Sequence, residues 1–325
     1  MANLFIDEGE TIAFAGDLHC DSVGTDARID DYQTTLLGKL EDILNKCLDN
    51  KVKALFFPGD IFSRVLVPHE SVTLLGEAFL QFKKAGIKVF TIVGNHDIAR
   101  NQQEKLAKSP LQTLFSLEVI EHINLNNPVI INGVTLVTPV NYTETPKQAM
   151  ASFKYNILLA HMFYNANELI DAGDHNITEQ DITDWQYDCA VLGHDHVPYD
   201  IKKVGRTDIV RAGSVMRASA HEYNFDRIPC FWILKNPHKY NVKNFKKIDI
   251  AAKPFIEIAS SSIVNKKEVN KDFQDVLSNL AERLTGTNIS NGEDRIISLI
   301  KTDDKVSKKV RALLFDYFNE AGIII

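Results

Sequence analysis

The stretch GIKVFTIVGNHD at residues 86–97 joins an apolar run to three polar side chains. The run has the length and composition of a strand buried inside a sheet. It stops at Gly94, which is followed by Asn95, His96 and Asp97. Amide, imidazole and carboxylate groups are costly to bury, and all three can bind a metal or take part in proton transfer. This stretch therefore predicts a reactive site at the end of a strand.

Four other apolar runs end in the same kind of residue. They are predicted strands at residues 11–16, 53–57, 156–161 and 188–193. The polar residues at their ends are Asp17, His19, Asp60, His161, His194 and His196. In a layered α/β fold the carboxyl ends of the strands converge on one crevice, so we expect these side chains to meet in space.

The candidate ligands are imidazoles, carboxylates and one amide, without a thiolate. Such a set suits manganese, iron or zinc better than copper. Seven ligands are too many for one tetrahedral ion and favour two ions that share a carboxylate, for which Asp60 is the natural bridge. In two-metal sites, ions roughly 3.5–4 Å apart clamp a phosphate, activate water and stabilise the leaving oxygen.

The ordered motifs D-x-H, G-D, G-N-H-D, H and G-H-x-H resemble those of the calcineurin-like metallophosphoesterase family. The resemblance implies a layered α/β/β/α sandwich that binds two divalent metal ions. It would assign the ligands of one ion as Asp17, His19, Asp60 and His196, and those of the other as Asp60, Asn95, His161 and His194. His96 would contact the scissile phosphate or protonate the leaving oxygen, and Asp97 would orient the His96 imidazole.

Within this family, residues 11–235 are similar to the SbcD-type DNA nuclease subunits of bacteria and their phages. The similar stretches are GDLHCDSVGTDARIDDY, PGDIFSR, VGNHD and RAGSVMRASAHEYNFDR. This similarity implies an exonuclease or endonuclease that hydrolyses DNA in repair, recombination or replication, usually with manganese. It also implies a coiled-coil ATPase partner of the SbcC type and a homodimer.

Other functions of the same motifs remain open at this point. A protein phosphatase or a cyclic or small-nucleotide phosphodiesterase would use the same ligands, and a non-catalytic scaffold would retain the fold without the chemistry. Arg64 and Arg217 flank the motifs and are candidates for binding substrate phosphate, because guanidinium groups bind phosphate in bidentate geometry. Ion pairing at the surface is the alternative for each of them.

The alternation of strands and helices predicts an α/β domain over residues 1–250 and a small α+β capping domain over residues 251–325. In the first domain we expect helices at 32–50 and 70–86. We also expect a hairpin with an Asn-Gly turn between the apolar runs 129–131 and 134–137. In the second domain we expect strands at 253–260 and 294–302 and helices at 267–283 and 305–321.

Composition bears on how the protein could bind DNA, on the state of its cysteines and on its location in the cell. The net charge of −7 argues against DNA binding through the whole surface, although residues 235–253 are rich in lysine. The four cysteines form no C-x-x-C motif, which is typical of reduced thiols. No apolar run approaches the roughly 20 residues of a membrane span, and the N-terminus lacks a secretory signal. We therefore expect a cytoplasmic protein that does not contact a membrane.

Overall fold

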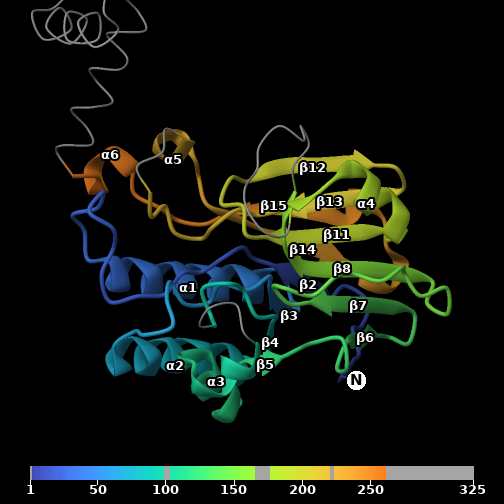
Figure 1. The fold of residues 1–325 in the computed structure, drawn as a ribbon, viewed down its shortest axis with the longest axis horizontal. Helices are drawn as coiled ribbons and strands as arrows, with labels where there is room; N and C mark the ends of the chain where they lie inside the picture. Colours follow the sequence, from blue (N-terminus) through green and yellow to red (C-terminus); the bar gives the residue numbers. More distant parts are fainter. Residues whose placement is uncertain (1, 99–102, 165–175, 220–222, 261–325) are drawn as a thin grey trace, which may run out of the picture. The chain divides into compact units, whose positions relative to one another are not determined.

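The structure is a computed structural model that describes residues 2–98, 103–164, 176–219 and 223–260. Within these ranges the chain forms two large β-sheets that pack face to face (Figure 1). Helices cover the outer face of each sheet. This arrangement confirms the predicted α/β/β/α sandwich.

The first sheet has the strand order β15-β14-β2-β3-β4-β5. Strands β2 to β5 are parallel, and β14 and β15 extend the sheet in antiparallel pairs. The strands are β2 (Thr11–Phe14), β3 (Val52–Phe57), β4 (Lys88–Thr91), β5 (Glu121–His122), β14 (Cys230–Lys235) and β15 (Phe245–Asp249). The first three correspond to the strands predicted at 11–16, 53–57 and 87–93.

The second sheet has the strand order β1-β6-β7-β8-β11-β13-β12. Its centre, β7, β8, β11 and β13, is parallel. The strands are β1 (Ala2–Leu4), β6 (Val129–Ile131), β7 (Thr135–Val140), β8 (Tyr155–His161), β11 (Cys189–Gly193), β12 (Tyr199–Val204) and β13 (Thr207–Arg211), and a separate parallel pair is formed by β9 (Phe163–Tyr164) and β10 (Asn176–Ile177). The predicted hairpin is β6–β7, and both turn residues, Asn132 and Gly133, have positive φ.

Two long helices cover the first sheet at the expected positions. The α-helices are α1 (Tyr32–Asp49), α2 (His69–Lys84), α3 (Pro110–Ser116), α4 (Glu179–Trp185), α5 (Tyr223–Asp226) and α6 (Phe255–Ile258). Short 3₁₀ turns lie at η2 (Gln103–Lys108), η3 (Pro237–Lys239) and η4 (Val242–Asn244). Asp31 caps α1 by accepting a hydrogen bond from the Thr34 N–H. None of the helices in the described ranges is long and apolar enough to cross a membrane.

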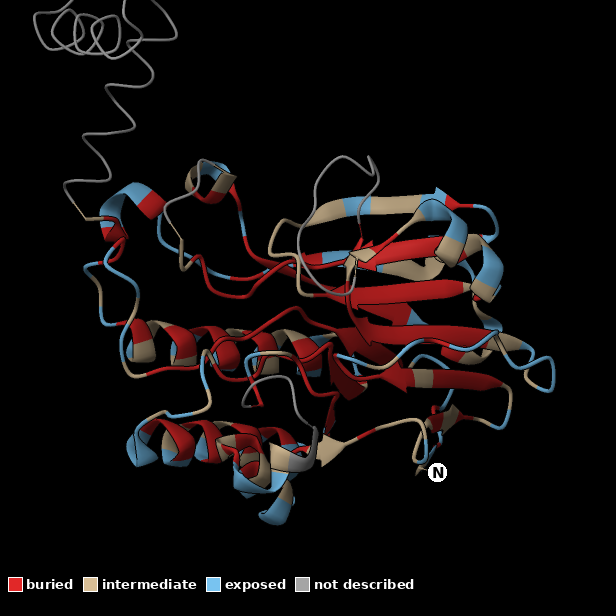
Figure 2. Cartoon of the chain, viewed as in Figure 1, coloured by how far each residue is buried: buried red, intermediate tan, exposed pale blue. Residues whose placement is uncertain are grey.

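Figure 2 shows that the central strands of the two sheets are buried along most of their length. Apolar side chains from both sheets form one cluster between them. Phe14, Phe56 and Phe90 stack across neighbouring strands with ring centroids 5.3 and 5.0 Å apart. They lie in the same cluster as Ile157 and Leu159 of the second sheet. Since this interior is apolar, the polar residues of the motifs lie where the strands end.

The expected strand at 253–260 is wrong, because residues 255–258 form the helix α6. Phe255 and Ile258 are buried while Ile256 is exposed, and this spacing of three fits a helical turn better than a pleated strand. The remaining elements expected in the capping domain lie outside the described residues. The boundary at 250/251 stays a prediction.

Candidate metal centre

The predicted ligands come together where strands of both sheets end. β2, β3 and β4 of the first sheet lead into Asp17, His19, Asp60 and Asn95, while β8 and β11 of the second sheet lead into His161, His194 and His196. Three groups have ligand atoms within 4.8 Å of one another, and one of them, His19 with Asp60 and His96, overlaps the other two. The remaining two groups are Asp17 with His19 and His196, and Asp60 with His161 and His194. We call them the first and the second cluster.

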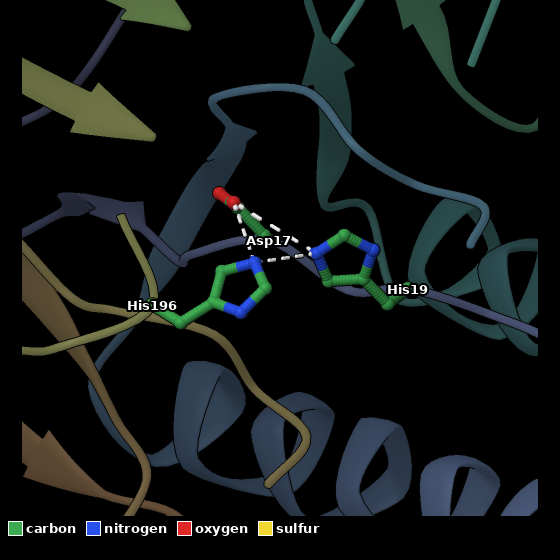
Figure 3. A group of neighbouring side chains, drawn as sticks. All are labelled: Asp17, His19 and His196. Atoms are coloured by element: carbon green, nitrogen blue, oxygen red, sulfur yellow. Dashed lines mark hydrogen bonds and ion pairs between the residues drawn. The ribbon is translucent and has the colours of Figure 1, made fainter. Parts of the chain in front are cut away.

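The first cluster is built around two imidazole rings (Figure 3). Figure 3 shows the His19 and His196 rings pointing towards each other beside the Asp17 carboxylate, with the two Nε2 atoms 2.8 Å apart. Asp17 Oδ2 lies 4.0 Å from the Nε2 of His19 and 3.7 Å from that of His196. Three donor atoms that converge in this way suit a single cation.

The second cluster is completed by the predicted amide ligand. Asn95 Oδ1 lies 2.9 Å from His161 Nε2 and 3.1 Å from His194 Nδ1. The opposite nitrogen of the His161 ring, Nδ1, donates to the Pro58 carbonyl at 2.7 Å. This bond selects the tautomer that leaves His161 Nε2 with a lone pair for a metal.

Asp60 lies between the two clusters. Its Oδ2 is 3.8 Å from His19 Nε2 and 3.3 Å from His161 Nε2, so one carboxylate oxygen faces both groups. Its Oδ1 accepts the His96 backbone N–H at 2.9 Å. This is the position that a bridging ligand requires.

The backbone around these ligands is unusual in two ways. His19, Asp60 and His194 have positive φ values of 52°, 49° and 81°, which L-residues rarely adopt. Gly94 approaches Asp60 so closely that a Cβ on it would lie 2.1 Å from Asp60 Oδ1. Strain of this kind persists where the surrounding structure enforces it, and it is concentrated at functional sites.

Burial changes the protonation of the clusters. It lowers the pKa of His19 to about 3 and that of His194 to about 4, so both rings are neutral and able to bind a metal. Burial also raises the pKa of Asp17 to about 8, and repulsion from Asp60 adds to this effect while His161 opposes it. Burial alone would lower the pKa of His161, but the Asp60 carboxylate outweighs it and raises the pKa to about 9.

These features fit two divalent cations. The donors are nitrogen and oxygen atoms without a thiolate, and the carboxylates of Asp17 and Asp60 are 1% exposed. Bound cations would compensate the buried charges and hold the ligands deprotonated. The prediction of two ion sites is therefore consistent with the clusters.

His96 differs from the ligands because its side chain is 46% exposed. Its Nδ1 donates to the Ser63 carbonyl at 2.8 Å, and its Nε2 lies 4.0 Å from Asp60 Oδ2. The ring is therefore held by the backbone, and it stands at the open side of the site with Nε2 turned towards the clusters.

The contacts of Asp97 differ from the orienting contact with His96 that the resemblance implies. Its carboxylate accepts the backbone N–H groups of Phe62 and Gly94 at 3.1 and 2.9 Å, and it is fully buried. It thus joins the loops after β3 and β4, and the contact that orients His96 comes from Ser63. Burial, followed by repulsion from Asp60, raises the pKa of Asp97 to about 7.

The two predicted arginines have different environments. Arg64 is half exposed, and its guanidinium makes a two-point ion pair with Asp21 at 2.8 and 2.9 Å. Arg217 is 4% exposed and donates to the carbonyls of Arg227 and Lys253. Since the Arg217 guanidinium is enclosed by backbone, its expected contact with substrate is not supported.

Two contributions to the site were missed in the sequence. The Ser63 carbonyl orients His96, and a backbone group leaves no signal in residue type. Asp195, between the ligands His194 and His196, forms an ion pair with Arg211, whose guanidinium lies 3.9 Å from the Tyr199 ring centroid. The signal available for this pair was an acidic residue placed between two ligand histidines.

This chain is similar to known proteins over more than half of its length. A family model described as calcineurin-like phosphoesterase matches residues 10–198. The DNA double-strand break repair protein Mre11 of Methanocaldococcus jannaschii is 22% identical over 91% of this chain and 87% of that protein. The protein of the same name from Methanococcus maripaludis is 21% identical over 76% of this chain and 69% of that protein. Among solved structures, a dimetal phosphatase from Danio rerio aligns with a TM-score of 0.46 and 10% identity, over 75% of this chain and 100% of that chain.

Proposed function

The chain belongs to the calcineurin-like phosphoesterase family, and on this premise we propose that it is a two-metal nuclease that hydrolyses phosphodiester bonds in DNA. The broader activity, that of a metal-dependent phosphoesterase, follows from the family. The choice of DNA is supported by the relatives named DNA double-strand break repair protein, which align with most of the chain. The observation that carries the two-metal mechanism is the position of Asp60 between two groups of buried ligands.

We assign the ligands as the sequence predicts. Asp17, His19, Asp60 and His196 would hold one ion, and Asp60, Asn95, His161 and His194 the other. Two divalent ions held by these residues would supply positive charge to a phosphate and would lower the pKa of a bound water. Manganese is our choice among the ions that this donor set suits.

In this mechanism His96 is the general acid that donates a proton to the leaving oxygen. The Ser63 carbonyl holds the Nδ1–H, so the proton available for transfer is the one on Nε2. Nε2 lies on the exposed side of the clusters, where a phosphodiester would approach. Asp97 is a positioning residue that keeps the loops carrying Asp60 and His96 together through two backbone N–H groups.

Arg64 remains a candidate for contact with a neighbouring phosphate. It is fixed by Asp21, and its side chain is 53% exposed, so part of the guanidinium stays open to a ligand. We also propose, from the similarity to SbcD-type subunits, a coiled-coil ATPase partner, a homodimer and a capping role for residues 251–325.

The test compares three substrates with manganese present: a labelled linear duplex DNA, a phosphoserine peptide and a cyclic nucleotide. Each is incubated with the wild type, with His96→Ala and with the control His69→Ala, which removes an exposed histidine at the start of α2. We expect the wild type and His69→Ala to cleave DNA. We expect His96→Ala to lose at least about 100-fold in rate, the usual contribution of a general acid.

Metal analysis of each variant separates the two parts of the proposal. His96→Ala should retain two manganese ions per chain, because His96 is not assigned as a ligand. Hydrolysis of only the peptide or the cyclic nucleotide would replace the nuclease by a phosphatase or a small-nucleotide phosphodiesterase. A metal-loaded wild type without turnover of any substrate would favour a scaffold over an enzyme.

A further inference from the structure

Residues 212–218 form a loop after β13 that lies directly behind the first cluster. The loop packs against the backbone of Gly16, two residues after the end of β2. The two segments are so close that a Cβ on Gly16 would lie 1.5 Å from the Gly213 carbonyl oxygen. Gly213 has a φ of +71°, and a Cβ there would lie 2.5 Å from the His196 carbonyl oxygen. There is no space for the loop to shift towards either segment.

The loop is hydrogen-bonded to two ligand residues of the first cluster. The Val215 N–H donates to the Asp17 carbonyl at 2.8 Å, and the Ser214 N–H donates to the His196 carbonyl at 3.2 Å. Asp17 follows β2 of the first sheet and His196 follows β11 of the second. The separation of these two ligands therefore depends on the position of residues 214 and 215.

Four consecutive carbonyls of the loop accept hydrogen bonds from basic side chains. Arg227 donates to Ser214 at 2.5 Å and to Met216 at 3.1 Å. Lys39 donates to Val215 at 2.7 Å, and Arg28 donates to Arg217 at 2.9 Å. We call Arg28, Lys39 and Arg227 the basic clamp.

The clamp residues are buried, and they come from separate parts of the chain. Arg28 precedes α1, Lys39 lies within α1 and Arg227 follows α5, and their exposed fractions are 8%, 4% and 8%. Arg28 is paired with Asp30, but within the described residues Lys39 forms no ion pair with a carboxylate. Burial, and then the neighbouring Arg217 and Arg227, hold the pKa of Lys39 well below its ordinary value.

A basic side chain is an expensive donor for a buried carbonyl, because it loses its hydration and is surrounded by other basic groups. Because three buried basic side chains bond this one loop, we infer that they hold the loop in a single position. The groups that depend on this position most directly are the two ligands bonded to Ser214 and Val215.

We propose that the basic clamp positions Asp17 and His196 for metal binding, and that Lys39 is a positioning residue for the ion of the first cluster. This inference rests on the proposed two-metal function. It predicts that disturbing the clamp weakens one metal site more than the other, because Ser214 and Val215 bond Asp17 and His196 but not Asn95, His161 or His194.

The experiment compares Lys39→Met with Lys46→Met by manganese titration calorimetry and metal analysis, without DNA. Lys46 is a matched control, because it lies two turns further along α1 and also donates to a backbone carbonyl, that of Asp249, at 2.8 Å. We expect Lys39→Met to lose about 10–100-fold in affinity at one site, as is typical for residues that orient ligands. Lys46→Met should bind both ions as the wild type does.

Two reference variants identify the affected site. The binding curve of Lys39→Met should approach that of His196→Ala, which removes a first-cluster ring, and differ from that of His161→Ala. In electron paramagnetic resonance, the signal of a coupled manganese pair should be replaced by that of an isolated ion. Arg227→Lys keeps the positive charge but has one nitrogen in place of the guanidinium that bonds both Ser214 and Met216. We expect it to lose less metal affinity than Lys39→Met. It replaces Lys39→Met in the test if that variant does not fold.

Binding of both ions by a folded Lys39→Met with wild-type affinity would overturn the proposal, as would an equal loss at both sites. A wild type that binds two ions but cleaves no DNA would contradict the nuclease function and leave the clamp intact. A wild type that binds only one ion would contradict both the two-metal function and the proposed role of the basic clamp.

Discussion

Single residues at the metal centre are constrained by their neighbours more than by their own chemistry. Asp60 faces both clusters with one oxygen and accepts a backbone N–H with the other, so both of its oxygens have partners. Gly94 makes this possible because it has no side chain at the point of closest approach. The glycine before a ligand is thus a steric requirement as well as a turn signal.

Gly94→Ala is expected to displace the Asp60 carboxylate, because the new Cβ would lie 2.1 Å from Oδ1. The variant should bind fewer than two manganese ions per chain, as measured by metal analysis after gel filtration. Gly38→Ala is the control, since its Cβ would meet nothing within 4 Å in the middle of α1. A Gly94→Ala protein with two tightly bound ions would contradict this account of Asp60.

Asp97 illustrates why neighbours in sequence need not be partners in space. It follows His96 directly, yet its carboxylate binds the backbone of Phe62 and Gly94 and the His96 ring binds Ser63. The turn after β4 directs the two side chains to different surroundings. Adjacent polar residues in a motif can therefore divide into one that faces the open side of the site and one that joins the loops.

At the level of elements, the site depends on where the strands and helices end. The parallel strands β2, β3 and β4 deliver their ligands in loops after the last paired residue, and α1 connects two of these strands. Helix α1 also carries Lys39, which reaches the loop behind the first cluster. The start of α1 is set by the cap at Asp31.

Asp31→Ala is expected to destabilise the protein by about 1 kcal/mol, the usual cost of losing an N-terminal cap. The free energy of unfolding in urea measures this change. Asp49→Ala provides the contrast on the same helix, because an acidic residue in the last turn opposes the helix dipole and its removal should not destabilise. An equal loss in both variants would show that the Thr34 bond does not contribute as a cap.

At the level of the whole molecule, one metal centre joins two sheets. Asp60 and Asn95 follow strands of the first sheet, and His161 and His194 belong to or follow strands of the second. Metal ions at the second cluster would therefore connect the halves of the sandwich. The buried Asp60 carboxylate lies close enough to Asp17 and Asp97 to help raise the pKa of both.

Removing the metal with a chelator is expected to lower the melting temperature. An ion at one hundred times its dissociation constant stabilises the folded state by about 2.7 kcal/mol per site. Differential scanning calorimetry before and after chelation measures the effect, and adding manganese back should restore it. An unchanged melting temperature in protein shown to be metal-free would mean that the ions do not bridge the two sheets.

The sequence by itself determined the type of fold and the candidate ligands. Apolar runs, helical periodicity and glycine turns are local properties, so the five ligand-bearing strands, α1, α2 and the β6–β7 hairpin were predictable from them. The candidate ligands were predictable because buried polar side chains need binding partners, and a shared metal site at five strand ends would provide them. The prediction of a strand at 253–260 was wrong because a short apolar stretch is compatible with both the helical and the strand periodicity.

Only the tertiary structure decided which groups touch. It separated Asp97 from the His96 ring, enclosed Arg217 in backbone carbonyls and paired Arg64 with Asp21. It also placed Arg28, Lys39 and Arg227 on one loop behind Asp17 and His196. These contacts join residues that are distant in the chain, and many of their acceptors are backbone carbonyls, which every residue has. Their partners are therefore selected by the packing of the two sheets and not by any local pattern of residue types.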